Sequence, residues 1–440
     1  LMPAAWQACP LQRGNKKNNM AITFGRYSDS FKPKEKINLW NESEKLFEEK
    51  KYMDSYKAFF NYIRDDKLNN VRFSQTDGKL DFEILQGSKI VRGYLDDKKV
   101  TAESDIAKFD KLSVALMRRL VEMNFTLYYT RFALNNDLIC LKFDSSLIDG
   151  SPKKLYYALK ELATRADKQD DLLIDDFSTL KTIEDAHIEK IPGQEKEIKY
   201  KYFRKWIEDT FKRISELKED TFSGAISYLL LNLLYKLDYL ISPEGTLMNE
   251  LEKISYAYFA RDNKPHGEKN KVMKEGFQKL LDKPKDAVLE DLYRVKLTFG
   301  IANPAPHPAV LDAINSNINN VQWYIDNNKE DIALIIIDYI IGYCLFSYGL
   351  AKPTVNLFHL LIFIRNRDYF NELGFTEKYY DSLQNKFDEG AVKDKIDQIL
   401  KEGIEQYPNL KFNADNLKFD KMINFARSFI TEIQTLNYNN

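Results

Sequence analysis

Residues 126–146 read TLYYTRFALNNDLICLKFDSS, two runs rich in aromatic and branched side chains on either side of the turn NND. Apolar and polar side chains alternate along both runs, which is the period of a strand with one buried face. Two such runs around a short polar turn indicate a β-hairpin. One face, with Phe132, is expected to pack under helices. The opposite face, with Tyr129 and Arg131, is the candidate surface for a partner.

The sequence on either side of this hairpin supplies more strands and two helices. Residues 71–95 hold Asp77 and Gly78 between two alternating runs, a dipeptide typical of a type I′ hairpin, and a further turn then leads into a third run. They therefore predict a three-stranded antiparallel meander. Residues 112–123 and 152–166 carry leucines at helical spacing and predict one amphipathic helix each.

A pair of helices is expected before the first strand. Residues 37–65 carry apolar side chains at helical spacing, with a break near residues 49–51. Ser43 and Ser55 are the small residues expected where the two helices cross. The spacing is close to that of a single tetratricopeptide-like helix pair, but no second copy follows. Because one repeat cannot bury its own apolar face, an ordinary helix hairpin docked on its neighbours is favoured.

The order of these elements resembles a known family. The order is helix pair, three strands, helix, two strands, helix, with the runs MRRLVEMNFTLYYTRFALNNDLICLKFDSSL (117–147) and KLYYALKELATRAD (154–167). This pattern resembles the YbjN family, which shares the fold of bacterial type III secretion chaperones. The resemblance covers about residues 40–170, less than a third of the chain. It implies a protein-binding α+β domain without catalytic activity. Because secretion chaperones of this fold are commonly dimers, it also implies a homodimer.

The second half of the chain reads differently. Residues 167–193 are charged and predict a loop, and after them the strand pattern gives way to helical periodicity. The expected fold class is α+β, with a helix hairpin and a five-stranded antiparallel sheet followed by an all-α half. Four segments are expected: a disordered or non-native extension at 1–36, the chaperone-like domain at 37–177, a helical region at 186–262 and an all-helical domain at 272–440.

Composition narrows the classes of partner. The chain has 65 Lys and Arg residues against 66 Asp and Glu residues, so its net charge near −1 predicts neither a nucleic-acid nor a membrane-surface partner. Three scattered cysteines indicate no disulfide framework, which favours a reducing cytosol as location, and the resemblance to the YbjN family implies that this cytosol is bacterial. Residues 332–350 are apolar enough to raise the question of a membrane span. They contain Asp338, however, which is costly at the centre of a bilayer, and a buried helix is favoured.

No pattern for a catalytic or metal site stands out. The sequence has no P-loop, dinucleotide-binding or serine-hydrolase motif, and its four histidines lack metal-ligand spacing. Paired carboxylates such as Asp170 and Asp171 are able to perform acid–base chemistry. Their positions at expected turns and helix ends favour solvated caps instead. The sequence therefore predicts neither a cofactor nor a metal ion.

A proline-rich loop at residues 299–311 is the second candidate surface. It reads FGIANPAPHPAVL, and its closely spaced prolines fix an extended path. Asn303, Pro304 and Pro306 are the residues that such a stiff loop would present to a partner. A rigid connection that caps the following helix is the favoured interpretation.

Together these observations predict a non-enzymatic cytoplasmic protein that binds a protein or peptide in the manner of a chaperone or adaptor. The alternative is an enzyme or small-molecule binder with a site inside the helical half. Buried polar residues there, such as Asp238, Asp338 and His359, are the candidates to line that site. Convergence of the three in one cleft would favour the alternative, and separate positions with their own partners would argue against it.

Overall fold

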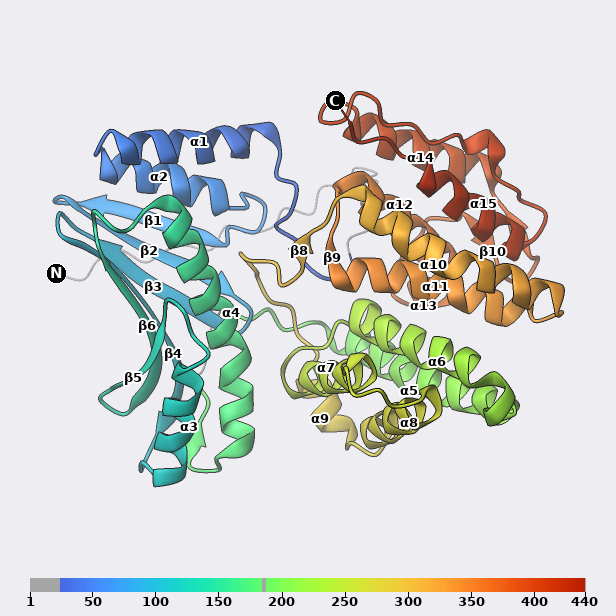
Figure 1. Cartoon of the computed structure of the whole chain (residues 1–440), viewed down its shortest axis with the longest axis horizontal. Coiled ribbons are helices and arrows are strands. Elements are labelled where there is room, and N and C mark those ends of the chain that lie inside the picture. The colour runs from blue at the N-terminus through green and yellow to red at the C-terminus, as the bar shows by residue number, and fades with distance from the viewer. Residues whose placement is uncertain (1–23, 184–186, 440) are drawn as a thin grey trace.

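Two lobes lie side by side in the computed structural model, which describes residues 24–183 and 187–439 (Figure 1). An α+β lobe is formed by the chain up to residue 181, and a lobe made mostly of helices by the chain from residue 193 onward. This arrangement confirms the α+β class. Residues 1–23, which hold most of the expected N-terminal extension, lie outside the described residues.

The first two helices form the expected hairpin. α1 (Lys34–Glu48) and α2 (Tyr52–Ile63) pack against each other along the top of the α+β lobe (Figure 1). Ser43 and Ser55 are buried where the helices meet, and each hydroxyl donates a hydrogen bond to the other residue's carbonyl oxygen, at 2.8 and 2.7 Å. Small side chains that satisfy each other's polar atoms permit this close approach. The prediction for the two serines is confirmed.

The sheet of this lobe has more strands than the five expected. Its main strands pair antiparallel in the order β1-β2-β3-β4-β6-β5, and a seventh, two-residue strand pairs with β4. The strands are β1 (Val71–Thr76), β2 (Lys79–Gln86), β3 (Lys89–Leu95), β4 (Lys99–Phe109), β5 (Arg131–Asn135), β6 (Leu138–Ser146) and β7 (Leu180–Lys181). Sequence patterns did not predict two of these strands, the short β7 and the central strand β4. Strand β4 buries Val100, Ala102, Ser104 and Ile106, and because two of these side chains are small, its hydrophobic alternation is weak.

Helices cover one face of this sheet. α4 (Pro152–Asp176) packs across β2, β3, β4 and β6, and α3 (Val114–Asn124) packs beside β5 (Figure 1). α4 continues through ten residues that were expected to belong to a loop, 167–176. The extension keeps helical spacing, with Ala166, Asp170 and Leu173 buried. An aspartate at one of these buried positions obscured the pattern in the sequence.

The second lobe is built mostly from helices. Its helices are α5 (Gly193–Ser215), α6 (Glu219–Lys236), α7 (Gly245–Phe259), α8 (His266–Leu281), α9 (Lys285–Glu290), α10 (His307–Asp326), α11 (Glu330–Ser347), α12 (Lys352–Arg365), α13 (Arg367–Glu372), α14 (Glu389–Gly403) and α15 (Met422–Gln434). Two pairs of two-residue strands join it, β8 (Asn303–Pro304) with β9 (Tyr348–Gly349) and β10 (Tyr380–Asp381) with β11 (Lys386–Phe387). A π-helical turn (Leu237–Ile241) continues α6.

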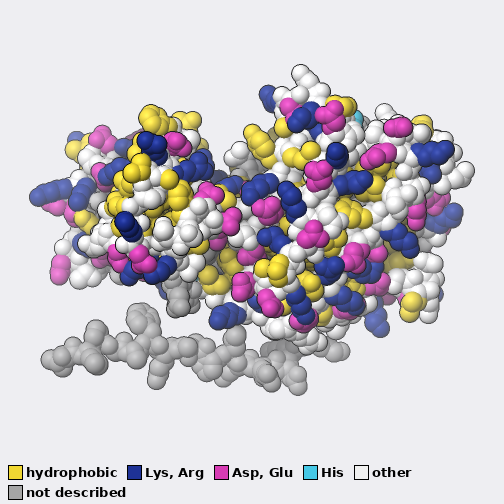
Figure 2. Space-filling model, turned by 90° about the horizontal axis from the view of Figure 1, so that it is seen from below, with side chains coloured by type: hydrophobic (Ala, Val, Ile, Leu, Met, Phe, Trp, Pro, Cys, Tyr) yellow, Lys and Arg dark blue, Asp and Glu magenta, His cyan; other side chains and the backbone are white. Residues whose placement is uncertain are grey.

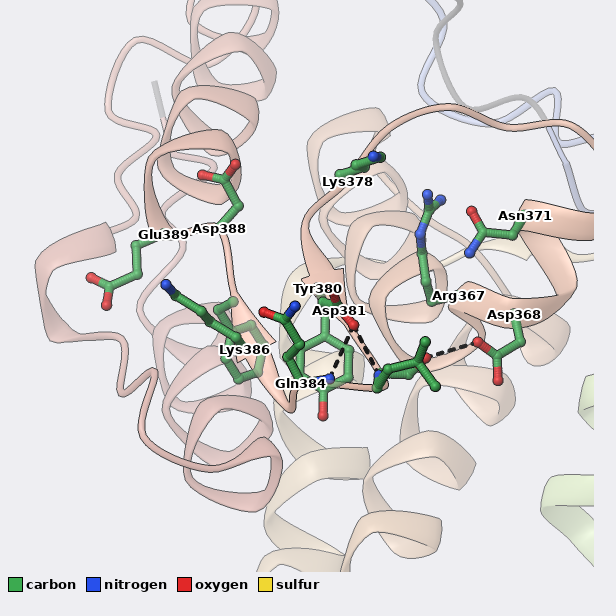
Figure 3. Close-up of a pocket in the computed structure, with 13 residues that line it drawn as sticks. Arg367, Asp368, Asn371, Lys378, Tyr380, Asp381, Gln384, Lys386, Asp388 and Glu389 are labelled. Atoms are coloured by element: carbon green, nitrogen blue, oxygen red, sulfur yellow. Dashed lines mark hydrogen bonds between the residues drawn. The ribbon is translucent and has the colours of Figure 1, made fainter.

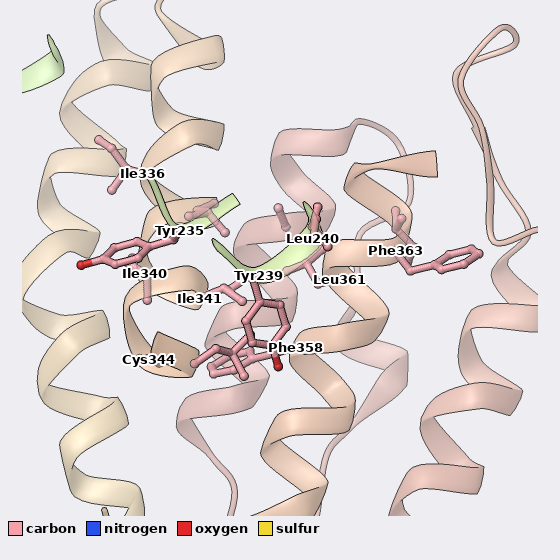
Figure 4. Packing of buried hydrophobic residues seen from close by; sticks show 14 of the residues in the cluster. Tyr235, Tyr239, Leu240, Ile336, Ile340, Ile341, Cys344, Phe358, Leu361 and Phe363 are labelled. Atoms are coloured by element: carbon pink, nitrogen blue, oxygen red, sulfur yellow. The ribbon is translucent and has the colours of Figure 1, made fainter. Parts of the chain in front are cut away.

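A single hydrophobic core fills the helical lobe. It takes buried residues from α5 at one end of the sequence to α15 at the other, and Figure 4 shows its centre around Tyr239, Ile340 and Phe358. The segment at 261–265 only links α7 to α8, which pack against each other. The regions expected as separate units, 186–262 and 272–440, therefore share one core.

The most apolar segment of the sequence lies inside this core as α11. Ile336, Ile337 and Ile340 are fully buried there. Asp338 forms an ion pair with Arg365 of α12 at 2.8 Å, which compensates for the charge on an otherwise apolar helix. Within the described residues, no helix is long and apolar enough to cross a membrane.

A loop of the helical lobe fastens the two lobes together. Between α9 and β8 the chain passes along the α+β lobe (Figure 1), and Phe299 is fully buried in that lobe's core. Gln86 of β2 accepts hydrogen bonds from the Thr298 and Phe299 N–H groups at 3.2 and 3.0 Å, and its amide donates to the Phe299 carbonyl at 3.2 Å. Asn70 donates to the carbonyl of Leu297 at 3.1 Å. These contacts continue the α+β core into the second lobe.

The segment that precedes α1 also joins the lobes. Arg26 forms ion pairs with Asp238 and Glu244 of the helical lobe, both at 2.9 Å. Asp29 accepts hydrogen bonds from the Tyr156 hydroxyl of α4 at 2.9 Å and from the Gly300 N–H at 3.0 Å. The part of the expected extension that the structure describes, residues 24–36, is therefore packed against both lobes. The sequence of residues 24–36 gave no periodic signal, because the residues that this segment contacts lie far away in the sequence.

Candidate protein-binding surface

Helix α3 carries two apolar stripes instead of one. Leu116, Leu120 and Met123 are buried against the sheet, as the sequence predicts. A second stripe runs along the exposed side of the helix and into the loop that follows it. We call it the apolar face, and its members are Val114, Met117, Val121, Phe125 and Tyr128. The spacing of three and four residues places Val114, Met117, Val121 and Phe125 on one side of the helix, and Tyr128 follows in the loop.

The apolar face is open to solvent. Tyr128 is 91% exposed, Phe125 87%, Val114 70% and Val121 54%. Figure 2, seen from below, shows hydrophobic side chains gathered on the underside of the α+β lobe, where Figure 1 places α3. Single exposed apolar residues are ordinary, whereas a group of them on one side of an element is typical of surfaces that interact with other molecules.

Glu161 of α4 fixes the loop that presents this face. Its carboxylate accepts hydrogen bonds from the N–H groups of Tyr128 and Tyr129, both at 2.8 Å, and of Thr130 at 3.0 Å, and also from the Thr130 hydroxyl at 3.0 Å. Four charge-assisted hydrogen bonds to one carboxylate hold the backbone in place. Tyr128 is thus presented on a loop that pays little additional ordering entropy on binding.

The same bonds set where the hairpin begins. The sequence predicts a strand from residue 126, whereas β5 starts at Arg131, because the preceding N–H groups are directed to Glu161. The N–H of Phe132 donates to the side chain of Asn124 at 2.7 Å. Side chains therefore occupy N–H groups at the start of the edge strand β5, which disfavours the addition of a partner strand there. The exposed side chains of α3 are not occupied in this way.

The two hairpin residues expected to meet a partner have different surroundings. Tyr129 is 39% exposed and adjoins the apolar face in the chain. Arg131 lies on the polar outer face of the sheet, where oppositely charged side chains pair across neighbouring strands. The pairs are Arg131 with Asp144, Lys142 with Glu103 at 2.8 Å, and Arg92 with Glu83 at 3.1 Å. The sheet itself satisfies the charge of Arg131, so Tyr129 is the better contact residue of the two.

The proline-rich loop lies in the middle of the molecule, far from α3 (Figure 1). Asn303 and Pro304 form β8, which pairs with β9, and Pro306 immediately precedes α10. All three residues are exposed, but the backbone between them is fixed, since the Ala305 N–H donates to the Gly349 carbonyl at 3.1 Å. The structure does not bring these residues together with Tyr129 and Arg131. The loop has the geometry of a rigid connection into α10.

The three polar residues considered for a site in the helical half each have a partner of their own. Asp238 pairs with Arg26 at 2.9 Å and Asp338 with Arg365 at 2.8 Å. His359 shares a hydrogen bond with the Tyr239 hydroxyl at 2.6 Å, and burial lowers the pKa of this histidine to about 4. Separate positions with satisfied partners argue against a site built from these three residues.

A group of buried and half-buried carboxyls lies between the lobes. We call it the interlobe carboxyl cluster, and its members are Asp167, Asp170 and Asp171 of α4 with Glu244 and Asp291 of the helical lobe. Asp170 pairs with Lys89 at 3.0 Å and accepts a hydrogen bond from the Ser88 hydroxyl at 2.6 Å. The expectation of a solvated cap is therefore wrong for Asp170, because α4 continues past it into the joint. Because Lys89 and Ser88 already bind the Asp170 carboxyl, we interpret the interlobe carboxyl cluster as structural.

The interlobe carboxyl cluster predicts an unusual pH dependence. Burial, and then the charges of Asp170 and Asp291, raise the pKa of Asp171 to about 7. Between about pH 4 and pH 7 the folded protein keeps this proton and the unfolded chain loses it, so the free energy of unfolding falls as the pH rises through this range. Replacing Asp171 with Asn removes the titration. From pH 5 to pH 8, we expect the free energy of unfolding of D171N to rise by about 2 kcal/mol relative to that of the unmutated protein, after allowance for partial solvent screening.

Urea denaturation of both proteins at the two pH values measures this gain. D175N, a substitution at an exposed position near the end of the same helix, is the control and should leave the pH dependence unchanged. An equal difference between D171N and the unmutated protein at both pH values would contradict the prediction.

The apolar face itself was not predicted, although its signal is present in the sequence. Val114, Met117, Val121 and Phe125 follow each other at three- and four-residue steps, in parallel with the stripe that is buried. When a helix has two apolar stripes and only one of them is buried, the local sequence does not show which one it is.

No protein-family model matches the chain, and no significant match is found among curated proteins.

Proposed function

We propose that this protein binds another protein chain through the apolar face, and that it acts by binding and not by catalysis. The observation that carries the proposal is the solvent-exposed apolar stripe of α3, which continues to Tyr128 in a loop whose backbone is held by Glu161. The resemblance of residues 40–170 to the YbjN family and the secretion chaperones supports it, since those chaperones bind segments of other proteins. The helical lobe packs against the α+β lobe through the contacts of Phe299 and Arg26 described above.

Charge around the apolar face indicates the chemistry of the partner. Arg118 and Arg119 of α3 are exposed, and neither forms an ion pair within the part of the chain that the structure describes. Arg118 lies four residues after Val114 and three before Val121, so it neighbours both on the helix surface. The best complement is a segment with apolar side chains flanked by Asp or Glu, because acidic groups at the rim would pair with these arginines and speed association.

Replacing Val121 and Phe125 with Asp tests the proposal. Both side chains are exposed, so we expect the free energy of unfolding to change by less than about 0.5 kcal/mol. Binding should weaken by at least about 100-fold, because a charge at the centre of an apolar contact must be desolvated. The control is Y256D, which places one charge at an exposed aromatic position on α7 in the other lobe.

Two measurements read the outcome. Proteins retained from a lysate of the source cell are compared among the three immobilised proteins, and purified samples are examined by sedimentation velocity. Proteins that are retained by the unmutated protein and by Y256D but lost from V121D/F125D support the proposal. A dimer that dissociates only in V121D/F125D would identify the partner as a second copy. Equal retention by all three, with a monomer in each case, would contradict the proposal.

A further inference from the structure

A pocket of about 820 Å³ opens in the helical lobe, away from α3. It lies between α13, the β10–β11 hairpin and the start of α14 (Figure 3). Its volume is in the range of pockets that hold small molecules. The lining residues used below are Arg367, Asp368, Asn371, Lys378, Asp388 and Glu389.

Arg367 is the least ordinary residue of this lining. Arg367 is only 6% exposed, and its Nη1 atom makes no hydrogen bond. It forms no ion pair with any residue that the structure describes, and its guanidinium lies 5.4 Å from the centre of the Phe363 ring. Burial lowers the pKa of this guanidinium. A buried cation with an unsatisfied donor is costly unless a partner of opposite charge is supplied.

Three aspartates of the pocket are bound within the fold, and Glu389 lies at the end of the pocket away from Arg367 (Figure 3). Asp368 accepts a hydrogen bond from the Ser382 hydroxyl at 3.0 Å. Asp381 accepts from the N–H of Leu383 at 2.9 Å and from that of Gln384 at 3.1 Å, which closes the β10–β11 turn. Asp388 caps α14 by accepting from the Ala391 N–H at 3.0 Å. Asp368 thus holds a side chain of the hairpin, Asp381 and Asp388 hold backbone, and none of the three forms an ion pair with Arg367.

The charges of the lining are separated along the pocket. Asn371 follows Arg367 by one helical turn on α13, and Figure 3 shows both side chains at the end of the pocket where Lys378 also extends. Asp388 and Glu389 lie at the opposite end (Figure 3). Lys378 and Asn371 are exposed side chains without a hydrogen bond of their own in the described structure. Small movements of these two side chains give a ligand access to the guanidinium.

We propose that this pocket binds a small ligand through an oxyanion group, a carboxylate or a phosphate. Arg367 holds the group, and Lys378 and Asn371 complete its hydrogen bonds. A guanidinium matches the geometry of either oxyanion because it donates two parallel N–H bonds. The remaining volume accommodates the body of the ligand beside Tyr380 and Phe387, whose rings are 4.7 Å apart. This site is independent of the apolar face.

Titration of the full chain with three probes tests the site. Inorganic phosphate, phenyl phosphate and benzoate are added separately, and binding is followed by calorimetry and by the amide NMR shifts of residues 367–389. We expect saturable binding of at least one probe, and comparison of the phosphates with benzoate shows which oxyanion is preferred. R367Q should weaken binding by at least about tenfold. K378Q should weaken it by about three- to tenfold without a change in stability, because Lys378 is exposed.

The control is K271Q, which removes the same charge from an exposed position on α8. Should R367Q fail to fold, K378Q against K271Q still decides the matter. Binding that is weakened by K378Q and not by K271Q supports the site. Equal weakening by both, equal binding in all variants, or no saturable binding of any probe would overturn it.

Discussion

Replacing Phe299 with alanine is expected to lower the free energy of unfolding by about 3–5 kcal/mol, the usual cost of truncating a fully buried phenylalanine. The ring belongs to a loop of the helical lobe but is buried in the core of the α+β lobe, 5.6 Å from the ring of Tyr156. Its backbone is bound from both sides by the amide of Gln86. Because the cavity would open where the lobes meet, F299A should also weaken their attachment to each other.

Urea denaturation measures the stability change, and hydrogen exchange resolved by peptide shows where it acts. We expect amides of β1 to β4 and of α4 to lose protection in F299A. The control is I301A, two residues further along the same loop, where the side chain is 71% exposed and its loss should cost less than about 0.5 kcal/mol. If F299A and I301A unfold at the same urea concentration, the loop does not fasten the lobes.

Replacing Arg26 with methionine is expected to cost about 3–5 kcal/mol at pH 8. Burial by itself would lower the pKa of this guanidinium, but Asp238 and Glu244 outweigh burial and raise it. Its Nη2 also donates to the Pro243 carbonyl at 2.8 Å. Methionine keeps much of the side-chain volume and removes the charge, which leaves two largely buried carboxylates without their cation.

The loss in R26M should be smaller at pH 5 than at pH 8, because burial raises the pKa of Glu244 and a protonated carboxyl no longer needs the arginine. The control is R92M, which removes an arginine from the exposed pair with Glu83 and should cost less than about 1 kcal/mol. Urea denaturation of both variants at the two pH values provides the test. A cost for R26M no greater than that for R92M would show that the segment before α1 is not a structural part of the joint.

Several features could be predicted from the sequence because they depend on neighbouring residues. The serine contacts of the α1–α2 hairpin, the meander of β1 to β3 and the buried side of α3 follow from spacing alone. Strand β4 was missed, since Ala102 and Ser104 weaken its alternation. The end of α4 was misplaced, since Asp170 occupies a buried position that only Lys89 of another element makes tolerable.

The candidate sites were predicted less well than the fold. Tyr129 lies next to the apolar face, but Arg131 belongs to the ion-pair array of the sheet. The pocket at Arg367 had no signal, because residues 367–389 become a lining only when the hairpin β10–β11 folds back over α13. A side chain can be recognised as lacking a partner only when the tertiary structure shows which residues surround it.

The sequence by itself determined those helices and strands whose apolar residues repeat clearly, because periods of 3.6 and 2 residues are local properties of the chain. The tertiary structure decided which apolar stripe of α3 is covered and which is left open. It also decided that Arg26 and Phe299 join the lobes, since Arg26 meets Asp238 and Phe299 meets Gln86 across more than 200 residues. The physical reason is that burial and charge compensation are set by neighbours in space, and the sequence does not state which residues these will be.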